Sequence, residues 1–364
     1  MYVPLLKTII GKYLGIESLL TPIILHLTLT NRCNSRCIMC NIWNDKDKED
    51  ITSVSLTKYK NSSFGKNLRI LDMTGGEPFL CDIPSIVKTL DNGKLQTILI
   101  SSNGFLTDKI ERNIKDILDI TKSNIIIDIS VDGIGKRHDE IRGVAGAYEK
   151  AIKTIMRLKS LGEKRIRISL KLTILKENFN QIMDCYQKAE ELEVDFTCKP
   201  GTTFGFLQNE NMDFDLQKSD YDKIIKDLEE ISRLRAKRTD YKMLSFWDRF
   251  FIISNHLFSD ELIRYYKIMR EGKRRMITPC YSSFLSVMMH NDSVVYSCPT
   301  LMKKMGSMNE QSLESIWSSD NAKKIRRFIN DKKCACFSQC DQMPALVVGK
   351  SPKVIGRVIA TYIR

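Results

Sequence analysis

The stretch TNRCNSRCIMCNIWN, residues 30–44, contains three cysteines within eight residues. Cys33, Cys37 and Cys40 follow the spacing C-x3-C-x2-C, and no fourth cysteine lies nearby. The run IILHLTLT over residues 23–30 comes directly before them and is typical of a short buried strand. The three thiols are therefore expected in the loop at the carboxyl end of a first strand. Barrel folds build their active sites at that end of the sheet.

Apolar, β-branched runs of similar length recur along the chain up to residue 200. They indicate five further strands, at residues 68–74, 96–102, 124–131, 165–175 and 194–200. Helical patterns lie between them, and the clearest cover residues 106–120 and 148–162. Six such strand–helix units predict an α/β fold, a partial (β/α)6 barrel of the TIM type, with parallel strands covered on both faces.

The pattern changes after Pro200. Helical segments without a strand follow, then a small cysteine-bearing region and a basic tail. The predicted divisions are an N-terminal amphipathic segment at 1–20, the barrel at 21–200, a helical insertion at 201–278, a small cysteine-rich domain at 279–345, and a basic amphipathic tail at 346–364.

Composition narrows the class of protein. The 364 residues are 43% hydrophobic and 28% charged, as in soluble globular proteins. No run approaches the ~18 apolar residues of a membrane span. Lys7 and Lys12 interrupt the N-terminal apolar stretch, so no signal peptide is expected and a cytoplasmic protein is predicted. In that compartment, metal binding explains the eleven cysteines better than disulfides do.

Three thiolates so close together suit one kind of metal centre. They can hold three irons of a four-iron cubane and leave the fourth iron open for another ligand. A structural zinc site would normally be closed by a fourth Cys or His. His26 lies inside the first predicted strand and is expected to be a core or wall residue, so it is a poor fourth ligand.

With Met39 between the second and third cysteines, the motif resembles the C-x3-C-x-Φ-C signature of the radical S-adenosylmethionine (SAM) superfamily, in which Φ is apolar or aromatic. The resemblance implies that Cys33, Cys37 and Cys40 are the catalytic metal ligands and hold a 4Fe-4S cluster. It implies that SAM binds the open iron through its amino and carboxylate groups. It also implies that an electron from the reduced cluster cleaves SAM to a 5'-deoxyadenosyl radical, which removes a hydrogen atom from the substrate.

Later segments resemble the SAM-binding motifs of the same family. TGGEPFL at residues 74–80 matches the G-G-E-P motif, whose glycines let the backbone approach the ligand. By this match Glu77 accepts a hydrogen bond from the SAM ammonium group, and Ser130 contacts the SAM ribose or carboxylate. The predicted cofactor-binding residues are Met39, Gly75, Gly76, Glu77, Pro78, Asn103, Ser130 and Arg142.

Arg142 and His138 lie in the segment HDEIRG, residues 138–143, which follows Ser130 and the fourth predicted strand. The resemblance implies that Arg142 pairs with the SAM carboxylate through its planar fork. A helix-cap salt bridge is the alternative for Arg142. His138 is expected in a loop or at the surface.

Five cysteines near the end of the chain form a second group. Cys280 and Cys298 bracket a predicted hairpin with its turn at residues 291–293, which would bring the two thiols together. The predicted metal ligands of this group are Cys280, Cys298, Cys334, Cys336 and Cys340. The arrangement resembles the SPASM extension, or its shorter form called twitch, and implies one auxiliary 4Fe-4S cluster.

Two departures from the SPASM pattern matter. C-x-C replaces C-x2-C, so the preferred ligand set is Cys280, Cys298, Cys336 and Cys340, with Cys334 as a substitute or spare. The family usually has glycine where this chain has Ser293. A turn tolerates that if Asn291 or Asp292 takes the strained position. A structural zinc site is the alternative for this group.

The substrate is less constrained by these motifs. The resemblance implies a dehydrogenation, epimerisation or bond-forming modification of a sugar, a glycolipid or other lipid-linked molecule, or a peptide. Peptide-modifying relatives usually carry a recognition domain before the barrel. Only about 20 residues precede the first strand here, so that domain is expected to be absent. A reductant such as flavodoxin or ferredoxin is the expected electron source.

Two other classes of protein stay open. One is an RNA-modifying enzyme of the same superfamily, which the net charge of +13 suggests, although no basic face lined with aromatics can be located and nucleic acid is not the expected partner. The charge is equally consistent with solvated lysines, an anionic membrane or an acidic partner. The other class is a non-catalytic iron–sulfur electron carrier.

Three apolar segments carry interleaved basic or aromatic residues, at 2–15, 244–258 and 351–364. We expect each to pack on the barrel. The alternative is that they lie on an anionic membrane, which basic amphipathic helices often do. In that case the protein would be cytoplasmic and peripheral at the inner membrane surface, with a lipid-linked substrate.

Overall fold

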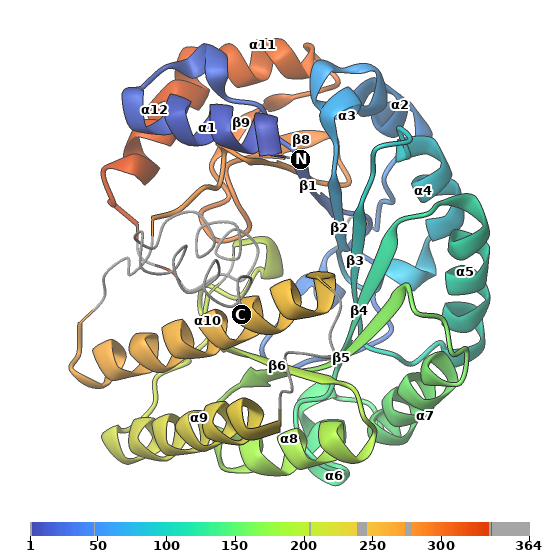
Figure 1. Cartoon of the computed structure of the whole chain (residues 1–364), viewed down its shortest axis with the longest axis vertical. Coiled ribbons are helices and arrows are strands. Elements are labelled where there is room, and N and C mark those ends of the chain that lie inside the picture. Colours follow the sequence, from blue (N-terminus) through green and yellow to red (C-terminus); the bar gives the residue numbers. More distant parts are fainter. Residues whose placement is uncertain are drawn as a thin grey trace.

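A single nine-stranded sheet organises the computed structural model, which describes residues 2–46, 48–203, 205–238, 246–273, 279–334 and 336. Six parallel strands form its first part, and each pairs with the strand before it (Figure 1). They are β1 (Ile24–Thr28), β2 (Ile70–Thr74), β3 (Thr97–Ser102), β4 (Asn124–Ser130), β5 (Ile166–Ile174) and β6 (Asp195–Pro200). All six strands predicted from the sequence are present, so the parallel α/β fold is confirmed.

Helices cover the convex side of these strands (Figure 1). They are α2 (Ser53–Asn61), α3 (Ser63–Asn67), α4 (Ile83–Leu90), α5 (Thr107–Ile120), α6 (Lys136–Arg142), α7 (Ala147–Lys159) and α8 (Ile182–Glu191). In α5, for example, Ile110, Ile114 and Ile117 are fully buried, because positions three and four apart share one face of a helix. That face joins the core formed by the outward side chains of the strands.

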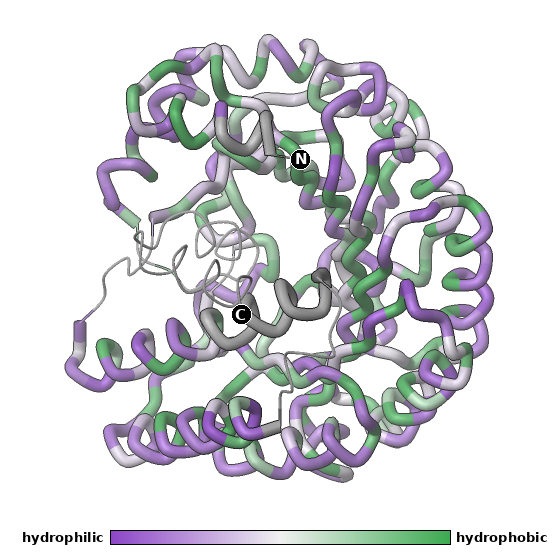
Figure 2. Tube along the Cα trace, viewed as in Figure 1, coloured by the Kyte–Doolittle hydropathy of each residue, from purple (hydrophilic) through white to green (hydrophobic). Residues whose placement is uncertain are grey.

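In strands β4, β5 and β6 one face is apolar and the other is mostly polar. In β4, Ile125, Ile127 and Ile129 are fully buried in the core, whereas Asp128 and Ser130 are partly exposed. The same alternation runs through β5 and β6, and hydrophilic and hydrophobic positions are mixed along these traces in Figure 2. The prediction that helices cover the strands holds for the convex face of the described sheet. On the concave face these three strands carry mostly polar side chains, and near β1 the Ile9 side chain of the N-terminal helix packs with Ile24 and Ile70.

The C-terminal region continues the same sheet. Strand β7 (Ser286–Met289) pairs in parallel with β1, and β8 (Val294–Tyr296) and β9 (Lys304–Ser307) follow in antiparallel order. The predicted hairpin is present, but its strained position is Ser293, with φ +69°, rather than Asn291 or Asp292. Asp292 instead accepts a hydrogen bond from the Val294 amide at 2.9 Å, which favours this turn.

Two further groups of helices complete the described chain. The predicted helical insertion contains α9 (Lys218–Arg238) and α10 (Phe246–Arg270), which lie side by side (Figure 1). At the opposite end lie α1 (Tyr2–Leu14), α11 (Leu313–Ser318) and α12 (Asp320–Asn330). Among the described residues, no helix has both the length and the apolar character needed to span a membrane. Cys340 and the predicted tail at 346–364 lie outside the described residues, as does part of the segment 244–258.

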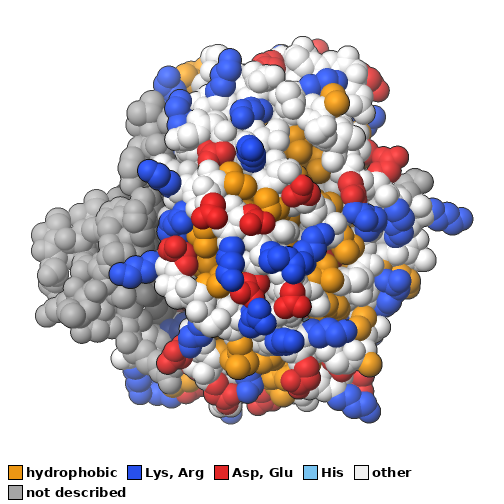
Figure 3. Space-filling view, turned by 90° about the vertical axis from the view of Figure 1, so that its right-hand side faces the viewer, with side chains coloured by type: hydrophobic (Ala, Val, Ile, Leu, Met, Phe, Trp, Pro, Cys, Tyr) orange, Lys and Arg blue, Asp and Glu red, His pale blue; other side chains and the backbone are white. Residues whose placement is uncertain are grey.

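The positive charge is not gathered on the face made by the outer helices. Figure 3 views this face, and cations and carboxylates are interspersed across it. Several are paired there; Glu111 of α5, for example, binds both Lys115 and Arg157. This face therefore has no continuous basic surface of the kind that binds nucleic acid.

Candidate active site

The loop with Cys33, Cys37 and Cys40 leaves the carboxyl end of β1 and is held by neighbouring backbone. Arg36 and Ile38 donate their amides to the carbonyls of Arg142 and Ile141 at 2.9 Å each. Further along, the Asn41 amide donates to the carbonyl of Leu207, in the short helix η5 (Gly205–Leu207), at 2.8 Å. The loop is thus fixed between the end of α6 and the start of the helical insertion.

Hydrogen-bond donors already point at the sulfurs of this loop. The Ser35 amide donates to Cys33 Sγ at 3.4 Å, and Arg142 Nη1 donates to Cys37 Sγ at 3.6 Å. The hydroxyl of Ser35 lies 3.1 Å from Cys37 Sγ. Donors of this kind stabilise thiolates, which is the form that binds metal.

Burial opposes ionisation of the same thiols. It raises the pKa of Cys33 to about 12 and that of Cys40 to about 11, and the neighbouring thiolate charges add to the effect. Thiols in this environment stay protonated unless a nearby cation compensates the charge. The donor set therefore fits a metal centre that supplies its own positive charge, and Met39 is buried beside these cysteines.

The G-G-E-P turn packs directly against the cysteine loop. Gly76 and Glu77 donate their amides to the carbonyls of Thr30 and Arg32 at 2.8 Å each. A Cβ on Gly76 would lie 2.1 Å from the Arg32 carbonyl oxygen, which no side chain tolerates. Gly75 has φ +146°, and a Cβ there would lie 2.6 Å from the Thr30 carbonyl oxygen. Pro78 then starts the short helix η3 (Pro78–Leu80).

Glu77 joins this turn to the end of β3. Its side chain is fully buried, and Oε1 accepts from the Ser102 hydroxyl at 2.9 Å while Oε2 accepts from the Asn103 amide at 2.8 Å. Burial raises the pKa of Glu77, and these hydrogen bonds oppose the rise. The Asn103 side chain in turn donates to Asn34 Oδ1 in the cysteine loop at 2.6 Å. Strands β1, β2 and β3 are thereby tied together at one end of the sheet.

A buried ion pair lies beside Cys37. Arg142 Nη2 is 2.5 Å from Asp132 Oδ2, and the other oxygen of Asp132 accepts from the Thr173 amide at 2.7 Å. The Asp132 amide donates to His138 Nδ1 at 2.9 Å. His138 is fully buried, so the expectation of a surface position was wrong. Burial, followed by the charge of Arg142, lowers the pKa of His138 to about 3 and keeps the ring neutral.

The concave face carries charged pairs that the sequence reasoning missed. Lys171 of β5 donates to Asp128 of β4 at 2.6 Å. Arg167 lies 3.6 Å from Asp195, one strand further along. The sequence hinted at these pairs only through single charged residues inside the apolar runs, such as Asp128 in β4 and Arg167 and Lys171, four residues apart, in β5. Ser130 lies on this face and is half-buried.

His26 of β1 belongs to the same face. Its Nδ1 lies 2.7 Å from Asp72 Oδ2 of β2, and its side chain is 4% exposed. This agrees with the prediction of a wall residue inside the first strand.

Four C-terminal cysteines lie near one another. Burial raises the pKa of Cys336, and so do the charges of Cys280, Cys298 and Cys334. The Ser282 amide donates to Cys280 Sγ at 3.4 Å, and the Leu301 amide donates to Cys298 Sγ at 3.3 Å. The hairpin thus brings its two thiols to one place, with backbone donors like those of the first loop.

Within the described part of the chain, no three Cys, His, Asp or Glu side chains are arranged to hold a single metal ion. A zinc ion would hold each ligand sulfur about 2.3 Å from the metal, so the sulfurs would be nearly in contact with one another. A four-iron cluster separates its cysteines further, because each thiolate binds a different iron.

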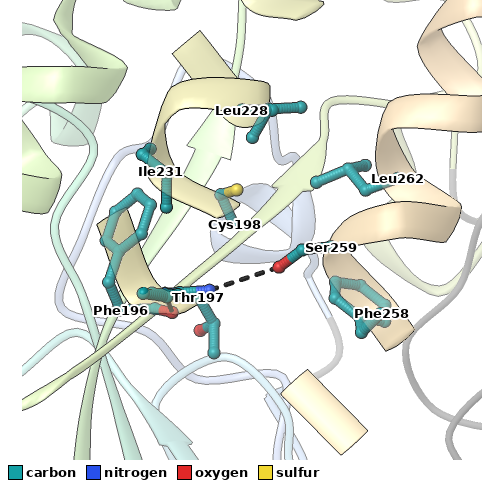
Figure 4. Close-up of a pocket in the computed structure, with 9 residues that line it drawn as sticks. Phe196, Thr197, Cys198, Leu228, Ile231, Phe258, Ser259 and Leu262 are labelled. Carbon is teal, nitrogen blue, oxygen red and sulfur yellow. Dashed lines mark hydrogen bonds between the residues drawn. The ribbon is translucent and has the colours of Figure 1, made fainter. Parts of the chain in front are cut away.

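A small recess lies on the helix-covered side of β6, between α9 and α10 (Figure 4). Phe196, Cys198 and Leu262 line it, and the dashed line marks the hydrogen bond from Arg235 Nη1 to the Ser259 hydroxyl at 3.2 Å. The Arg235 guanidinium also lies over the rings of Tyr186 and Phe196. These contacts join the insertion to the sheet, on the side away from the concave face.

Two family models match the chain. The model of the radical SAM superfamily matches residues 27–189, and the SPASM model, an iron-sulfur cluster-binding domain, matches residues 276–341. The radical SAM domain binds a 4Fe-4S cluster and SAM, and the SPASM domain binds auxiliary iron–sulfur clusters.

Characterised relatives are enzymes. Fe-coproporphyrin III synthase of Methanosarcina barkeri is 25% identical over 68% of this chain and 59% of its own length. Pre-heme d1 synthase of Dinoroseobacter shibae is 28% identical over 46% of this chain and 40% of its own. The chain therefore spans only about half the length of these relatives. Sporulation killing factor maturation protein SkfB of Bacillus subtilis is 22% identical over 88% of this chain and 70% of its own.

Solved structures share the fold. The enzyme anSMEcpe with bound AdoMet (SAM) has a TM-score of 0.60 at 14% identity, over 93% of this chain and 96% of that chain. Streptococcus suis SuiB bound to precursor peptide SuiA has a TM-score of 0.57 at 16% identity, over 87% of this chain and 69% of that chain. At these identities the likeness concerns the fold.

Proposed function

Because the chain is an enzyme of the radical SAM superfamily with a C-terminal SPASM domain, we propose that it removes a hydrogen atom from a peptide substrate held on the concave face of its sheet. When bound, the cluster and SAM supply the 5'-deoxyadenosyl radical for this step. The observation that carries the proposal is the close packing of the cysteine loop on the G-G-E-P turn, at the carboxyl ends of β1 and β2.

We assign the cluster to Cys33, Cys37 and Cys40. The Ser35 amide and the Arg142 guanidinium would stabilise two of these sulfurs as thiolates. Arg142 is already paired with Asp132, so we assign it to the cysteine loop rather than to the SAM carboxylate. In this assignment Arg142 forms a structural ion pair, as in the alternative given from the sequence, and the ion pair holds the guanidinium beside the Cys37 sulfur.

We assign SAM to the surface beside this loop. The backbone of Gly75 and Gly76 would form its edge together with Pro78, because the two glycines have no side chain that would block a ligand. Glu77 would act indirectly, since its carboxylate holds Asn103 and the β3 terminus in position. Met39 and Ser130 would complete the site from the cysteine loop and from β4.

The auxiliary cluster would be held by Cys280, Cys298 and Cys336, with either Cys334 or Cys340 as the fourth ligand. Cys334 is near the other three, which supports it as the substitute that the C-x-C spacing suggested. When bound, such a cluster would supply one-electron redox chemistry beside the substrate, and a reductant such as flavodoxin or ferredoxin would deliver electrons to the enzyme.

A peptide is the substrate class that the comparisons support best. SkfB is named as a maturation protein and matches 88% of this chain, and SuiB was solved with a precursor peptide. The charged pairs Asp128–Lys171 and Arg167–Asp195 on the concave face suit the amides and charged side chains of a peptide. Sugar and glycolipid substrates have no such support among these relatives.

The test begins with SAM cleavage by the reconstituted, dithionite-reduced enzyme under anaerobic conditions. The wild type should make 5'-deoxyadenosine, and the Cys33→Ala, Cys37→Ala, Cys40→Ala triple variant should make none. Iron should fall by about four per chain in the variant, the content of one cubane. Product formation by the triple variant would refute the cluster assignment.

The substrate assignment needs a second measurement. Short peptides encoded beside the gene, carrying deuterium on carbon, should transfer deuterium into 5'-deoxyadenosine. Transfer from a deuterated glycolipid or sugar, with none from any peptide, would replace the peptide by that substrate while leaving the radical chemistry intact.

A further inference from the structure

Among the described side chains of helix α1, Thr8, Ile9 and Lys12 face the protein, and Ile9 packs on a buried apolar cluster that includes Ile24. Thr8 is buried, and its hydroxyl and the Thr21 backbone hydrogen-bond to each other at 2.9 and 3.3 Å. Lys12 Nζ donates to the Cys280 carbonyl at 2.9 Å and lies 4.5 Å from the centre of the Phe284 ring. Gly11 contacts the chain at Ile16 so closely that a Cβ would lie 2.8 Å from its carbonyl oxygen. The described part of the helix is therefore anchored through the Thr8 hydroxyl, the Lys12 ammonium group and the apolar side chain of Ile9.

Four apolar side chains of the same segment face solvent. Ile10 is 41% exposed, Tyr13 75%, Leu14 68% and Ile16 40%. They make up more than half of the large hydrophobic side chains that are exposed in the described part of the chain. We call these four residues the α1 apolar face. A soluble protein rarely exposes large apolar side chains side by side, so this group marks a candidate contact surface.

Positive charge borders the α1 apolar face. Lys7 is exposed one turn before Ile10. Lys12 also donates to Asn330 Oδ1 at 3.2 Å, which places α1 beside the end of α12, where Lys332 and Lys333 are exposed. The carboxylates near them are paired: Glu17 with the buried Arg326, and Asp331 with Lys333 at 3.3 Å. The border therefore has a net positive charge.

We propose that the α1 apolar face docks on an anionic lipid membrane, with Lys7 and Lys332 against the headgroups. Aromatic and aliphatic side chains flanked by lysines are what an interfacial helix inserts into such a surface. A second copy of the chain fits less well. It would bring the same cations, and four side chains cannot supply the ~800 Å² per partner of a stable dimer. This inference does not rest on the proposed reaction or substrate.

The test is co-sedimentation of the full, cluster-loaded chain with vesicles of phosphatidylcholine alone or with phosphatidylserine. Binding should be at least tenfold stronger to the anionic vesicles, because each lysine near such a surface adds about fivefold. It should weaken from 0.05 to 0.5 M salt, as the Debye length shortens. The double variant Tyr13→Ser, Leu14→Ser should lose most of the binding. Met156→Ser, which removes a 57% exposed apolar side chain from α7, should keep it.

Three results would overturn the proposal. One is equal binding to neutral and anionic vesicles, or none to either. Another is the same loss in the Met156→Ser control as in the α1 double variant. The third is a dimer of the wild type, seen by analytical ultracentrifugation and abolished by the α1 double variant without any vesicle binding, which would make a second copy the occupant. Circular dichroism of the double variant checks that the substitutions have not simply unfolded the chain.

Discussion

His138 and Arg142 illustrate how single buried residues define the site. Both follow strand β4 in the sequence, and both converge on Asp132: Arg142 through an ion pair, His138 through the backbone amide. Because a neutral imidazole is needed to accept that hydrogen bond, the arrangement depends on His138 staying unprotonated. The ion pair beside the cysteines is thus supported by a group that titrates.

The first prediction concerns pH. The pKa of His138 is about 3 in the folded chain and about 6.5 when unfolded, so the unfolded state binds the proton more tightly. The contribution of His138 is complete above pH 6.5 and is lost as pH falls toward 3. Between pH 7.5 and 5.5 the wild type should lose roughly 1–1.5 kcal/mol of unfolding free energy through this residue.

Guanidinium denaturation at the two pH values measures this loss. His138→Asn keeps an acceptor for the Asp132 amide but cannot titrate, so its stability should change less with pH than that of the wild type. An identical pH dependence in the two proteins would contradict the role given to His138.

The second prediction concerns Lys12, whose ammonium group touches the backbone of Cys280. A nearby cation favours the reduced, more negative cluster, so Lys12→Gln should lower the reduction potential of the auxiliary cluster. The expected shift is on the order of 59 mV, a tenfold change in a one-electron equilibrium. A redox titration followed by electron paramagnetic resonance measures it.

Two choices make that experiment specific. The titration is done in the Cys33→Ala, Cys37→Ala, Cys40→Ala background, which leaves only the auxiliary cluster. Lys7→Gln removes the same charge from an exposed position on the same helix and should leave the potential unchanged. Equal potentials for the wild-type, Lys12 and Lys7 chains would show that Lys12 does not act on the cluster.

The site is formed where the cysteine loop and the G-G-E-P turn pack on each other. The cysteine loop follows β1 and the G-G-E-P turn follows β2, and parallel strands bring these two ends together. The glycines are needed because the turn's backbone lies against the loop's backbone, with no room for a Cβ.

The third prediction tests this packing with Gly76→Ala. The added methyl would lie 2.1 Å from the Arg32 carbonyl oxygen and must push the cysteine loop aside. Iron should fall from about eight to about four per chain, and SAM cleavage should be lost. Iron analysis and chromatography of 5'-deoxyadenosine give both results.

Gly93→Ala is the matched control. Gly93 has φ +71°, and a Cβ at this position would have no other atom within 4 Å. Alanine there should cost about 1 kcal/mol of stability through backbone strain alone. Its iron content should stay near eight. Loss of iron in both variants, or in neither, would contradict the steric explanation.

At the scale of the whole molecule, the two metal regions share one sheet. Strand β7, which begins six residues after Cys280, pairs in parallel with β1, which ends five residues before Cys33. The C-terminal region is therefore not a separate appendage on a linker. Its stability and that of the barrel should be coupled through the β1–β7 hydrogen bonds.

The fourth prediction follows from this coupling. Cys298→Ala should lower iron from about eight to about four per chain, because one cubane is lost. Metal binding there is coupled to folding, so the variant should also unfold at a lower temperature in a single transition with the barrel. Iron analysis and differential scanning calorimetry test the two parts.

Cys185→Ala provides the comparison, since Cys185 is a fully buried thiol of α8 outside both cysteine groups. It should keep about eight irons. Unchanged iron in Cys298→Ala, or one zinc per chain in the wild type, would refute the auxiliary cluster.

The sequence alone determined the features that depend on local pattern. The runs of β-branched residues indicated the six parallel strands, and the spacing of Cys33, Cys37 and Cys40 indicated the position of the metal loop. The hairpin between Cys280 and Cys298 was also predictable, because turn residues and flanking apolar runs are close together in the chain. The sequence could not predict which turn residue takes positive φ. Ser293 is held there because its carbonyl accepts a hydrogen bond from the Met308 amide, just after β9, and its hydroxyl hydrogen-bonds to that of Ser55 in α2.

Only the tertiary structure decided the features that join distant residues. The polar concave face depends on ion pairs between neighbouring strands, 43 residues apart for Asp128 and Lys171. The burial of His138 depends on how α6 packs under the end of β4. The exposure of Ile10, Tyr13 and Leu14 depends on how α1 is held, in part by Lys12 reaching Cys280, 268 residues away. Local composition fixes which side chains are apolar, but the contact that a helix finds in the folded chain decides which of its faces is buried.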